Sequence, residues 1–206
     1  MNSLMPSIYD LCRFREDLTR EVILGPFKQV EDDGIPLRRT AFVCLDAVLS
    51  SCEALVDLGL AVEVVAEGIG DPFDALRCSA LTLSDHYSVK LTSHRALRRI
   101  VLLRGGTDAL LPALAQITEA LRKTLSFKPK RDAVQQEIER VEEMKGGALS
   151  AALALHADAS ILESQVFQTF LQEVMSDPAL SKKFASLRSD VTAAPPGALP
   201  IAMDTA

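Results

Sequence analysis

The sequence predicts an all-α protein of stacked helical pairs, interrupted once by a β-hairpin. Apolar residues recur at intervals of three and four along most of the 206 residues, which is the spacing of one buried helix face. Predicted helix starts at positions 36, 71 and 107 are almost evenly spaced, as in repeat proteins built from helix pairs. Only the run 20–35 breaks the helical pattern. These features predict an α-solenoid of the HEAT or armadillo kind, a right-handed superhelix of helical pairs.

The first half of the chain is expected to hold four helices, over about 4–20, 36–56, 58–69 and 71–83. In the second of these, Arg38 and Arg39 occupy outward positions of the apolar pattern. The third is assigned as a helix, although its segment 60–65 also has the composition of a strand. The fourth has a clear start signal, because Asp71 suits the N-cap position and Pro72 suits the first helical position.

The second half is expected to continue with helices over about 93–103, 107–125, 134–155, 160–174 and 178–187. A kink or break is predicted at Gly146 and Gly147, since each Gly costs a helix about 1 kcal/mol relative to Ala. Ser160 and Glu163 match a capping box. The domain is expected to span 1–190, and the Ala/Pro/Gly-rich segment 191–206 to be a disordered tail.

Composition narrows the class of protein. Apolar residues make up 48% of the chain and aromatic residues 5%, with no Trp, so we expect an aliphatic core. No stretch approaches the roughly 18 apolar residues of a membrane span, and the first residues lack a secretory pattern. The net charge of −6 disfavours nucleic acid, because phosphate neutralisation dominates that binding. We therefore expect no membrane and no nucleic acid as partner.

The hairpin is predicted from residues 20–34. Two runs of strand formers, 21–24 and 27–30, flank Gly25 and Pro26, which suit the two positions of a type II′ turn. An isolated hairpin is marginally stable in water, so it should pack on the helices or project toward a partner. The sequence equally allows an ordered linker without a binding role.

Sites for chemistry are not evident. The four cysteines lack paired spacing, and Cys44 and Cys52 lie about 12 Å apart on one predicted helix, too far for a disulfide. We expect reduced, buried thiols of the cytosol or nucleus. His86, His94 and His156 are expected to be surface or satisfied residues rather than metal ligands. No phosphate-binding loop or nucleophile motif is present, so we expect no enzyme, no cofactor and no metal.

A cluster of four arginines has two interpretations. Arg95, Arg98, Arg99 and Arg104 can form a basic stripe on a helix opposite its apolar residues. A solvated helix face is the preferred interpretation. Contact with an acidic partner is the alternative.

Specific residues around the hairpin resemble a known family. The matching positions are Phe14–Val22, Leu24–Lys28, Val30, Asp32–Gly34, Arg38-Arg39 and Ala41-Phe42. They closely resemble the C-terminal end of the cullin-associated, neddylation-dissociated proteins. Further matches fall at Glu67-Gly68, along 128–148 and at 177–180, so the resemblance covers roughly 1–190, but not 84–106. Members of that family are very long solenoids, so we expect this chain to be a fragment, a split subunit or a truncated product.

The resemblance implies a non-catalytic regulator of cullin–RING ubiquitin ligases in the cytoplasm and nucleus. In that family, the C-terminal HEAT repeats bind the N-terminal region of an unmodified cullin. A hairpin there intrudes on the site of the substrate-receptor adaptor, which promotes substrate-receptor exchange and controls ligase assembly. The alternatives are a generic HEAT or armadillo scaffold, such as a transport-receptor fragment, and a helical enzyme that uses its histidines.

Carried onto this sequence, the resemblance predicts a protein-binding site on the hairpin. Contact is expected from the tip residues Leu24, Pro26, Phe27 and Lys28. Asp32 and Asp33 are expected to orient the hairpin base or to cap the next helix. The full predicted set is Val22, Leu24, Gly25, Pro26, Phe27, Lys28, Val30, Asp32 and Asp33.

Overall fold

The computed structural model describes residues 4–24, 27–71, 83–129 and 133–193. In these ranges the chain is mostly helical, with one two-stranded sheet. The helices are α1 (Leu4–Cys12), α2 (Ile35–Ser51), α3 (Leu58–Ile69), α4 (Leu83–Leu102), α5 (Gly106–Leu110), α6 (Leu114–Ser126), α7 (Gln135–His156), α8 (Ala159–Leu162), α9 (Gln165–Ser176) and α10 (Pro178–Ala193). The strands are β1 (Thr19–Leu24) and β2 (Phe27–Asp32). Within the described ranges, no helix combines the length and apolar content needed to cross a bilayer.

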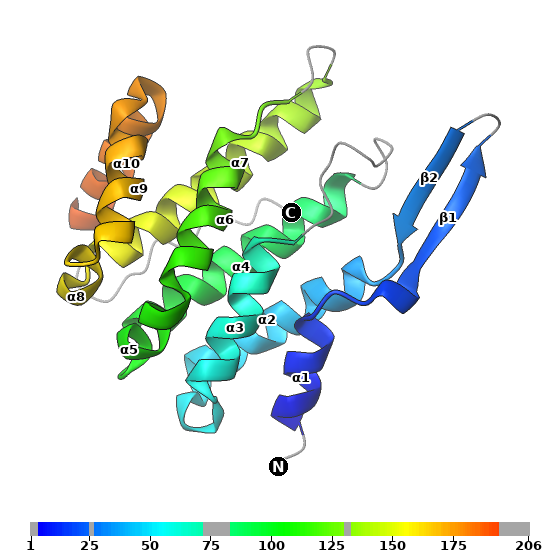
Figure 1. The fold of residues 1–206 in the computed structure, drawn as a ribbon, viewed down its shortest axis with the longest axis horizontal. Coiled ribbons are helices and arrows are strands. Elements are labelled where there is room, and N and C mark those ends of the chain that lie inside the picture. Colours follow the sequence, from blue (N-terminus) through cyan, green and yellow to red (C-terminus); the bar gives the residue numbers. More distant parts are fainter. Residues whose placement is uncertain (1–3, 25–26, 72–82, 130–132, 194–206) are drawn as a thin grey trace.

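The long helices stack in two layers. One layer contains α2, α4, α7 and α10, each in contact with the next. The second contains α1, α3, α6 and α9 in the same order. Each helix of one layer also packs on the helix next to it in the chain, so the layers are joined pair by pair. The hairpin lies at one end of these rows and α10 at the other (Figure 1).

The interior between the layers is aliphatic, as the composition predicts. It forms one continuous cluster that draws on almost every long helix. Fully burying each large apolar side chain stabilises the fold by about 1.5–3 kcal/mol. Among the largest buried side chains are Phe42, Leu45, Leu97, Ile117, Phe167 and Phe184.

A close approach of three helices depends on Gly68 at the end of α3. A Cβ at this position would lie 2.4 Å from Cζ of Phe42 on α2 and 2.4 Å from Oγ of Ser93 on α4. No side chain fits at that separation, so glycine is needed here for space. Gly68 thereby lets α3 pack closely against α2 and α4 of the other layer.

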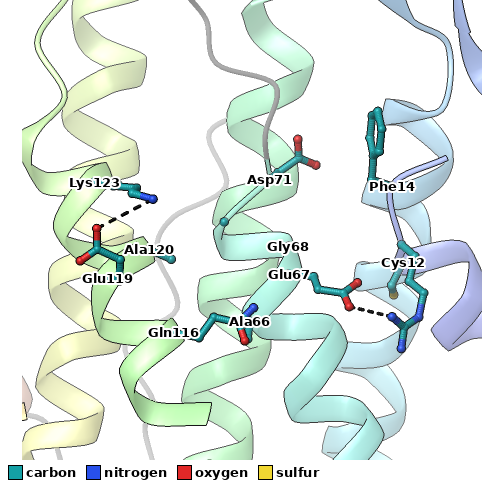
Figure 2. Close-up of a pocket in the computed structure, with 12 residues that line it drawn as sticks. Cys12, Phe14, Ala66, Glu67, Gly68, Asp71, Gln116, Glu119, Ala120 and Lys123 are labelled. Atoms are coloured by element: carbon teal, nitrogen blue, oxygen red, sulfur yellow. Dashed lines mark hydrogen bonds and ion pairs between the residues drawn. The ribbon is translucent and has the colours of Figure 1, made fainter. Parts of the chain in front are cut away.

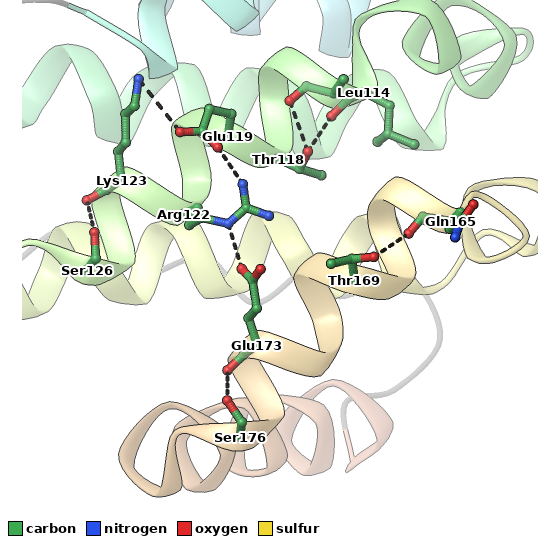
Figure 3. A network of polar contacts seen from close by, with 11 residues as sticks. Leu114, Thr118, Glu119, Arg122, Lys123, Ser126, Gln165, Thr169, Glu173 and Ser176 are labelled. Carbon is green, nitrogen blue, oxygen red and sulfur yellow. Dashed lines mark hydrogen bonds and ion pairs between the residues drawn. The ribbon is translucent and has the colours of Figure 1, made fainter.

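Polar contacts on the outer surface join α6 to α9 (Figure 3). Nε of Arg122 donates to Oε2 of Glu173 at 2.6 Å, and the same guanidinium pairs with Glu119 one turn earlier. These side chains are exposed, so each pair contributes at most about 1 kcal/mol. Their role is to keep the two helices aligned rather than to supply most of the stability.

Most predicted helices are confirmed, and the strand alternative for 60–65 is wrong, because α3 is helical throughout. The first helix ends at Cys12, not near Arg20. Arg15 has an extended backbone, and a short 3-10 turn over Glu16–Leu18 leads into β1. The hydroxyl of Thr19 donates to the carbonyl of Glu16 at 2.6 Å, which closes this turn. Strand β1 begins at Thr19, so Thr19 and Arg20, which the apolar pattern assigned to the first helix, belong to the strand.

The helix predicted at 93–103 begins ten residues earlier, at Leu83. Hydroxyl residues obscure its apolar pattern, but they are satisfied within the helix. Thr92 donates to the carbonyl of Ser88 at 2.8 Å, and Ser93 to that of Val89 at 2.8 Å. Such bonds to the preceding turn let hydroxyl residues lie inside a helix.

Two helix starts also need correction. The segment after Thr107 is not one helix, because a 3-10 turn containing Pro112 separates α5 from α6, and Pro lacks the N–H that would continue the helix. Ser160 does not start a helix: Asp158 caps α8 instead, and its carboxylate accepts from the N–H of Ser160 at 2.9 Å. The helix predicted from 178 does begin there: Asp177 precedes α10, and its carboxylate accepts from the N–H of Ala179 at 2.8 Å.

The predicted tail, the helix predicted from Pro72 and the predicted buried thiols compare with the structure as follows. Residues 191–193 belong to α10, so the predicted tail begins later than 191, and 194–206 lie outside the described residues. The helix expected from Pro72 also lies outside them. Of the cysteines, Cys12 is buried, but Cys44 and Cys52 are exposed thiols, contrary to the prediction.

The predicted break at Gly146 and Gly147 is wrong, because α7 runs through both residues. Gly147 faces α4, where an added Cβ would lie 3.0 Å from Cδ2 of Leu91 and 3.2 Å from Nδ1 of His94. Gly146 is different, since its Cβ would meet only Cε of Lys183 at 3.9 Å. The helix therefore tolerates both glycines, and one of them permits close packing.

This difference predicts opposite effects of two Ala substitutions. Gly146→Ala should raise the free energy of unfolding by about 1 kcal/mol, because helix propensity improves without a clash. Gly147→Ala should lower it by about 1 kcal/mol or more, because the new methyl group crowds α4. Urea denaturation of both variants measures the difference. Equal stabilisation by the two substitutions would contradict the packing described here.

Candidate protein-binding site

The hairpin projects from the end of the helical layers, in the connection between α1 and α2 (Figure 1). Its register pairs Thr19 with Asp32 at the base and Leu24 with Phe27 at the tip. A two-residue connection is therefore confirmed, although Gly25 and Pro26 lie outside the described residues. The strands are longer than predicted, at six residues each.

The predicted contact residues fall on this projecting element, and part of it is open to solvent. Ile23 is 68% exposed, Glu21 is exposed and Val22 is half-buried. The side chains of Leu24, Phe27, Lys28 and Val30 lie outside the described part of the structure. Ile23 thus presents a large apolar side chain to solvent on the projecting strand.

The base of the hairpin is fixed by a buried ion triad. Nη2 of Arg38, in the first turns of α2, lies 2.8 Å from Oδ2 of Asp32 at the end of β2. Nε of the same guanidinium donates at 3.1 Å to Oδ2 of Asp71, just beyond α3. All three side chains are at most 5% exposed. Arg38 thus ties β2, α2 and the end of α3 together.

Two further contacts complete the surroundings of Arg38. The ring of Phe14 lies 5.4 Å from the guanidinium carbon, within the range of a cation–π contact. The other carboxylate oxygen of Asp32 accepts from the N–H of Gly34 at 2.8 Å. A Cβ at Gly34 would lie 3.0 Å from that carboxylate and 3.2 Å from Arg38, so this glycine leaves room for the triad.

The predicted roles of Asp32 and Asp33 can now be separated. Asp32 is buried and orients the hairpin base through Arg38 and Gly34. Asp33 is exposed, and its carboxylate lies 3.2 Å from Nε of Arg20 on β1. The same arginine donates to Glu31 at 3.1 Å across the sheet. Asp32 is therefore a positioning residue, whereas Asp33 belongs to an exposed cross-strand ion cluster.

Sequence reasoning missed Arg38 as the centre of this site. The apolar pattern places it on the outward face of its helix, but the structure leaves it only 2% exposed. Its partner Asp71 is 33 residues away in the chain, so no local spacing connects the two. The available signal was the pair of acidic residues at 32 and 33, followed by two arginines one to two turns into the helix.

A cavity of about 530 Å³ opens beside the hairpin base, between α1, the end of α3 and α6 (Figure 2). Arg13 spans its rim and pairs with Glu67 at 2.6 Å and Glu63 at 2.8 Å. Cys12 lines it, and burial raises the pKa of this thiol to about 12. The thiol therefore stays protonated near neutral pH and is a poor nucleophile.

The described residues contain no cluster of His, Cys, Asp and Glu suited to a metal ion. His156 packs edge-on against Phe184. Contrary to the prediction, His94 is only 1% exposed, and neither ring nitrogen has a hydrogen-bond partner among the described residues. The side chain of His86 lies outside the described part.

Comparison with known proteins identifies the family. The model of the TIP120 family, described as TATA-binding protein interacting (TIP20), matches residues 1–175. The chain belongs to the TIP120 family. This match includes the hairpin, the triad that fixes its base and the helices through most of α9.

Relatives of this TIP120 chain confirm the resemblance seen in the sequence. It is 30% identical over 195 residues to cullin-associated NEDD8-dissociated protein 2 of Mus musculus, covering 95% of the chain. It is 34% identical over 188 residues to cullin-associated NEDD8-dissociated protein 1 of Arabidopsis thaliana. A protein of Emericella nidulans named as the C-terminal part of protein 1 is 31% identical over 149 residues. The chain spans only 14% of the length of the mouse and Arabidopsis relatives.

Proposed function

We propose that this chain is a non-catalytic regulator of cullin–RING ubiquitin ligases that binds the cullin scaffold through its hairpin. Membership of the TIP120 family and relatives named as cullin-associated support a role with cullins. The observation that carries the proposal is the projecting hairpin, whose base is fixed by the Arg38 triad. A pre-formed element loses little conformational entropy on binding, so a rigid hairpin is suited to insert into a partner.

The proposal has three further parts. The paired layers form a HEAT-repeat solenoid that presents the hairpin. The hairpin occupies the surface where the substrate-receptor adaptor binds an unmodified cullin, so the two compete and receptors exchange. The chain acts by binding alone, without cofactor or metal, in the cytoplasm and nucleus.

Charge substitutions at the hairpin tip test this proposal. The variant Leu24→Asp with Phe27→Asp should weaken binding to an unmodified cullin scaffold by about tenfold or more, because two carboxylates would be desolvated in an apolar contact. The affinity is measured by biolayer interferometry with immobilised cullin. A matched control, Leu102→Asp with Val134→Asp, adds the same charge at exposed apolar positions on other elements and should bind like the original chain.

The result also decides between this function and a generic scaffold. A scaffold that binds along its helical surface would be indifferent to the tip variant and sensitive to substitutions on the helices. Equal binding of the tip variant and the original chain, with both folded by circular dichroism, would therefore overturn the hairpin as the binding element.

A further inference from the structure

A second candidate site lies in the layer that contains α4, α7 and α10, and it extends toward α10, the helix at the end away from the hairpin (Figure 1). A groove of about 500 Å³ runs between these three helices. The residues that carry its chemistry are His94, Arg95, Arg98, Glu142, Glu143 and Lys183. None of them belongs to the hairpin or to the triad at its base.

Arg95 and Arg98 of α4 form the basic wall of this groove. In the part of the chain that the structure describes, Arg95 and Arg98 form no hydrogen bond and no ion pair, whereas their neighbour Arg99 lies 3.3 Å from Asp46. Burial, followed by the charges of Arg95 and Arg99, lowers the pKa of Arg98. Three guanidinium groups therefore crowd one stretch of α4, and Asp46, the acidic residue whose charge reaches Arg98, is paired with Arg99.

The floor of the groove is also unsatisfied. His94 lines it and is 1% exposed, and within the described ranges neither of its ring nitrogens has a hydrogen-bond partner. A buried polar group without a partner costs stability, so such groups call for an explanation. An acidic or polar group that entered the groove would find two free guanidinium groups and this imidazole along the same wall.

The opposite wall limits the kind of ligand. Glu142 and Glu143 on α7 face the groove, and Lys183 of α10 lies 3.1 Å from Glu142. A nucleic-acid backbone or an anionic membrane would bring repeated negative charge against these two carboxylates. The apolar side chains of Leu91 and Leu187 also line the groove. The mixed lining fits a segment with one or two acidic side chains between apolar ones.

We propose that the groove between α4, α7 and α10 binds a short acidic peptide segment of a partner protein, with its carboxylate on Arg95 and Arg98. This assignment selects the acidic-partner interpretation of the basic stripe over the solvated one. It is independent of the hairpin, because the residues that line the groove belong neither to the hairpin nor to the triad at its base.

Selection from a phage-displayed library of random peptides tests this site with the full chain as bait. We expect the selected peptides to be rich in Asp and Glu beside apolar residues. A selected peptide, synthesised with a fluorophore, should lose affinity by about tenfold or more in the variant Arg95→Gln with Arg98→Gln, as for a lost charge-assisted hydrogen bond. The matched control is Arg39→Gln with Arg104→Gln, two exposed arginines outside the groove, which should bind normally.

Two further variants test the location of the peptide site without changing any arginine. Gly146→Leu puts a side chain into the groove beside Lys183 and should weaken peptide binding to a similar extent. Glu143→Gln removes repulsion and should strengthen it. Selection of no acidic peptide, or equal binding by the Arg95 and Arg98 variant, would overturn the proposal. Full displacement of the peptide by an equal concentration of inorganic phosphate would also overturn it, because the site would then be a simple anion site.

Discussion

Replacing Arg38 by Met is expected to lower the free energy of unfolding by about 3–5 kcal/mol. The substitution keeps the length of the side chain but removes the cation that the buried carboxylates of Asp32 and Asp71 share. Removing one partner of a buried ion group is far more costly than removing the whole group, because the remaining charge stays desolvated. Urea denaturation measures the loss.

The same variant should loosen the hairpin before the rest of the fold. Asp32 ends β2, and its carboxylate is held there by Arg38 and by the N–H of Gly34. We therefore expect faster hydrogen exchange at the β1 and β2 amides than in the original chain. Arg39→Met is the matched control, since Arg39 is exposed and surface substitutions usually change stability by less than about 0.5 kcal/mol. Similar losses in the two variants would contradict the role given to Arg38.

Acid should destabilise the protein partly through His94. Burial, and then the charge of Lys90, lowers the pKa of this imidazole from 6.5 to about 3 in the folded chain. Between these two values the unfolded chain binds a proton that the folded chain excludes, so stability falls as the pH falls through this window. At one pKa unit per 1.36 kcal/mol, the loss from pH 7.5 to pH 5.0 is about 2 kcal/mol.

The variant His94→Leu isolates this effect. Its stability should fall less than that of the original chain between pH 7.5 and pH 5.0, by about 2 kcal/mol, because no group at position 94 titrates. The other charged groups near the imidazole are present in both proteins, so their titration cancels in the comparison; they are Lys90, Arg95, Arg98, Glu142, Glu143 and Lys183. Parallel pH profiles for the two proteins would show that His94 is not held neutral.

The hairpin could be predicted because its signals are local. Gly25 and Pro26 separate two runs of strand formers, and the observed register leaves those two residues between the strands. The stacked helices could be predicted for a similar reason, since a buried helix face repeats every few residues. Prediction failed where hydroxyl residues of α4 or the glycines of α7 interrupt that repeat but are accommodated by packing.

The burial of Arg38 and His94 could not be predicted, because it depends on contacts between distant segments. Arg38 looks outward by spacing alone and is buried only because α2 meets β2 and the end of α3. His94 looks like a polar surface residue and is buried because Gly147 lets α7 approach α4. For Arg38, the partner Asp71 is 33 residues away in the sequence. For His94, the neighbour is Gly147, which has no side chain that would indicate the contact.

A competition experiment tests the central claim most directly. This chain, labelled with a fluorophore and bound to an unmodified cullin scaffold, is titrated with the substrate-receptor adaptor while its fluorescence anisotropy is followed. If the hairpin occupies the adaptor surface, the adaptor should displace the chain completely, and the variant Leu24→Asp with Phe27→Asp should be displaced at a lower adaptor concentration. A stable complex that contains cullin, adaptor and this chain together would contradict the account.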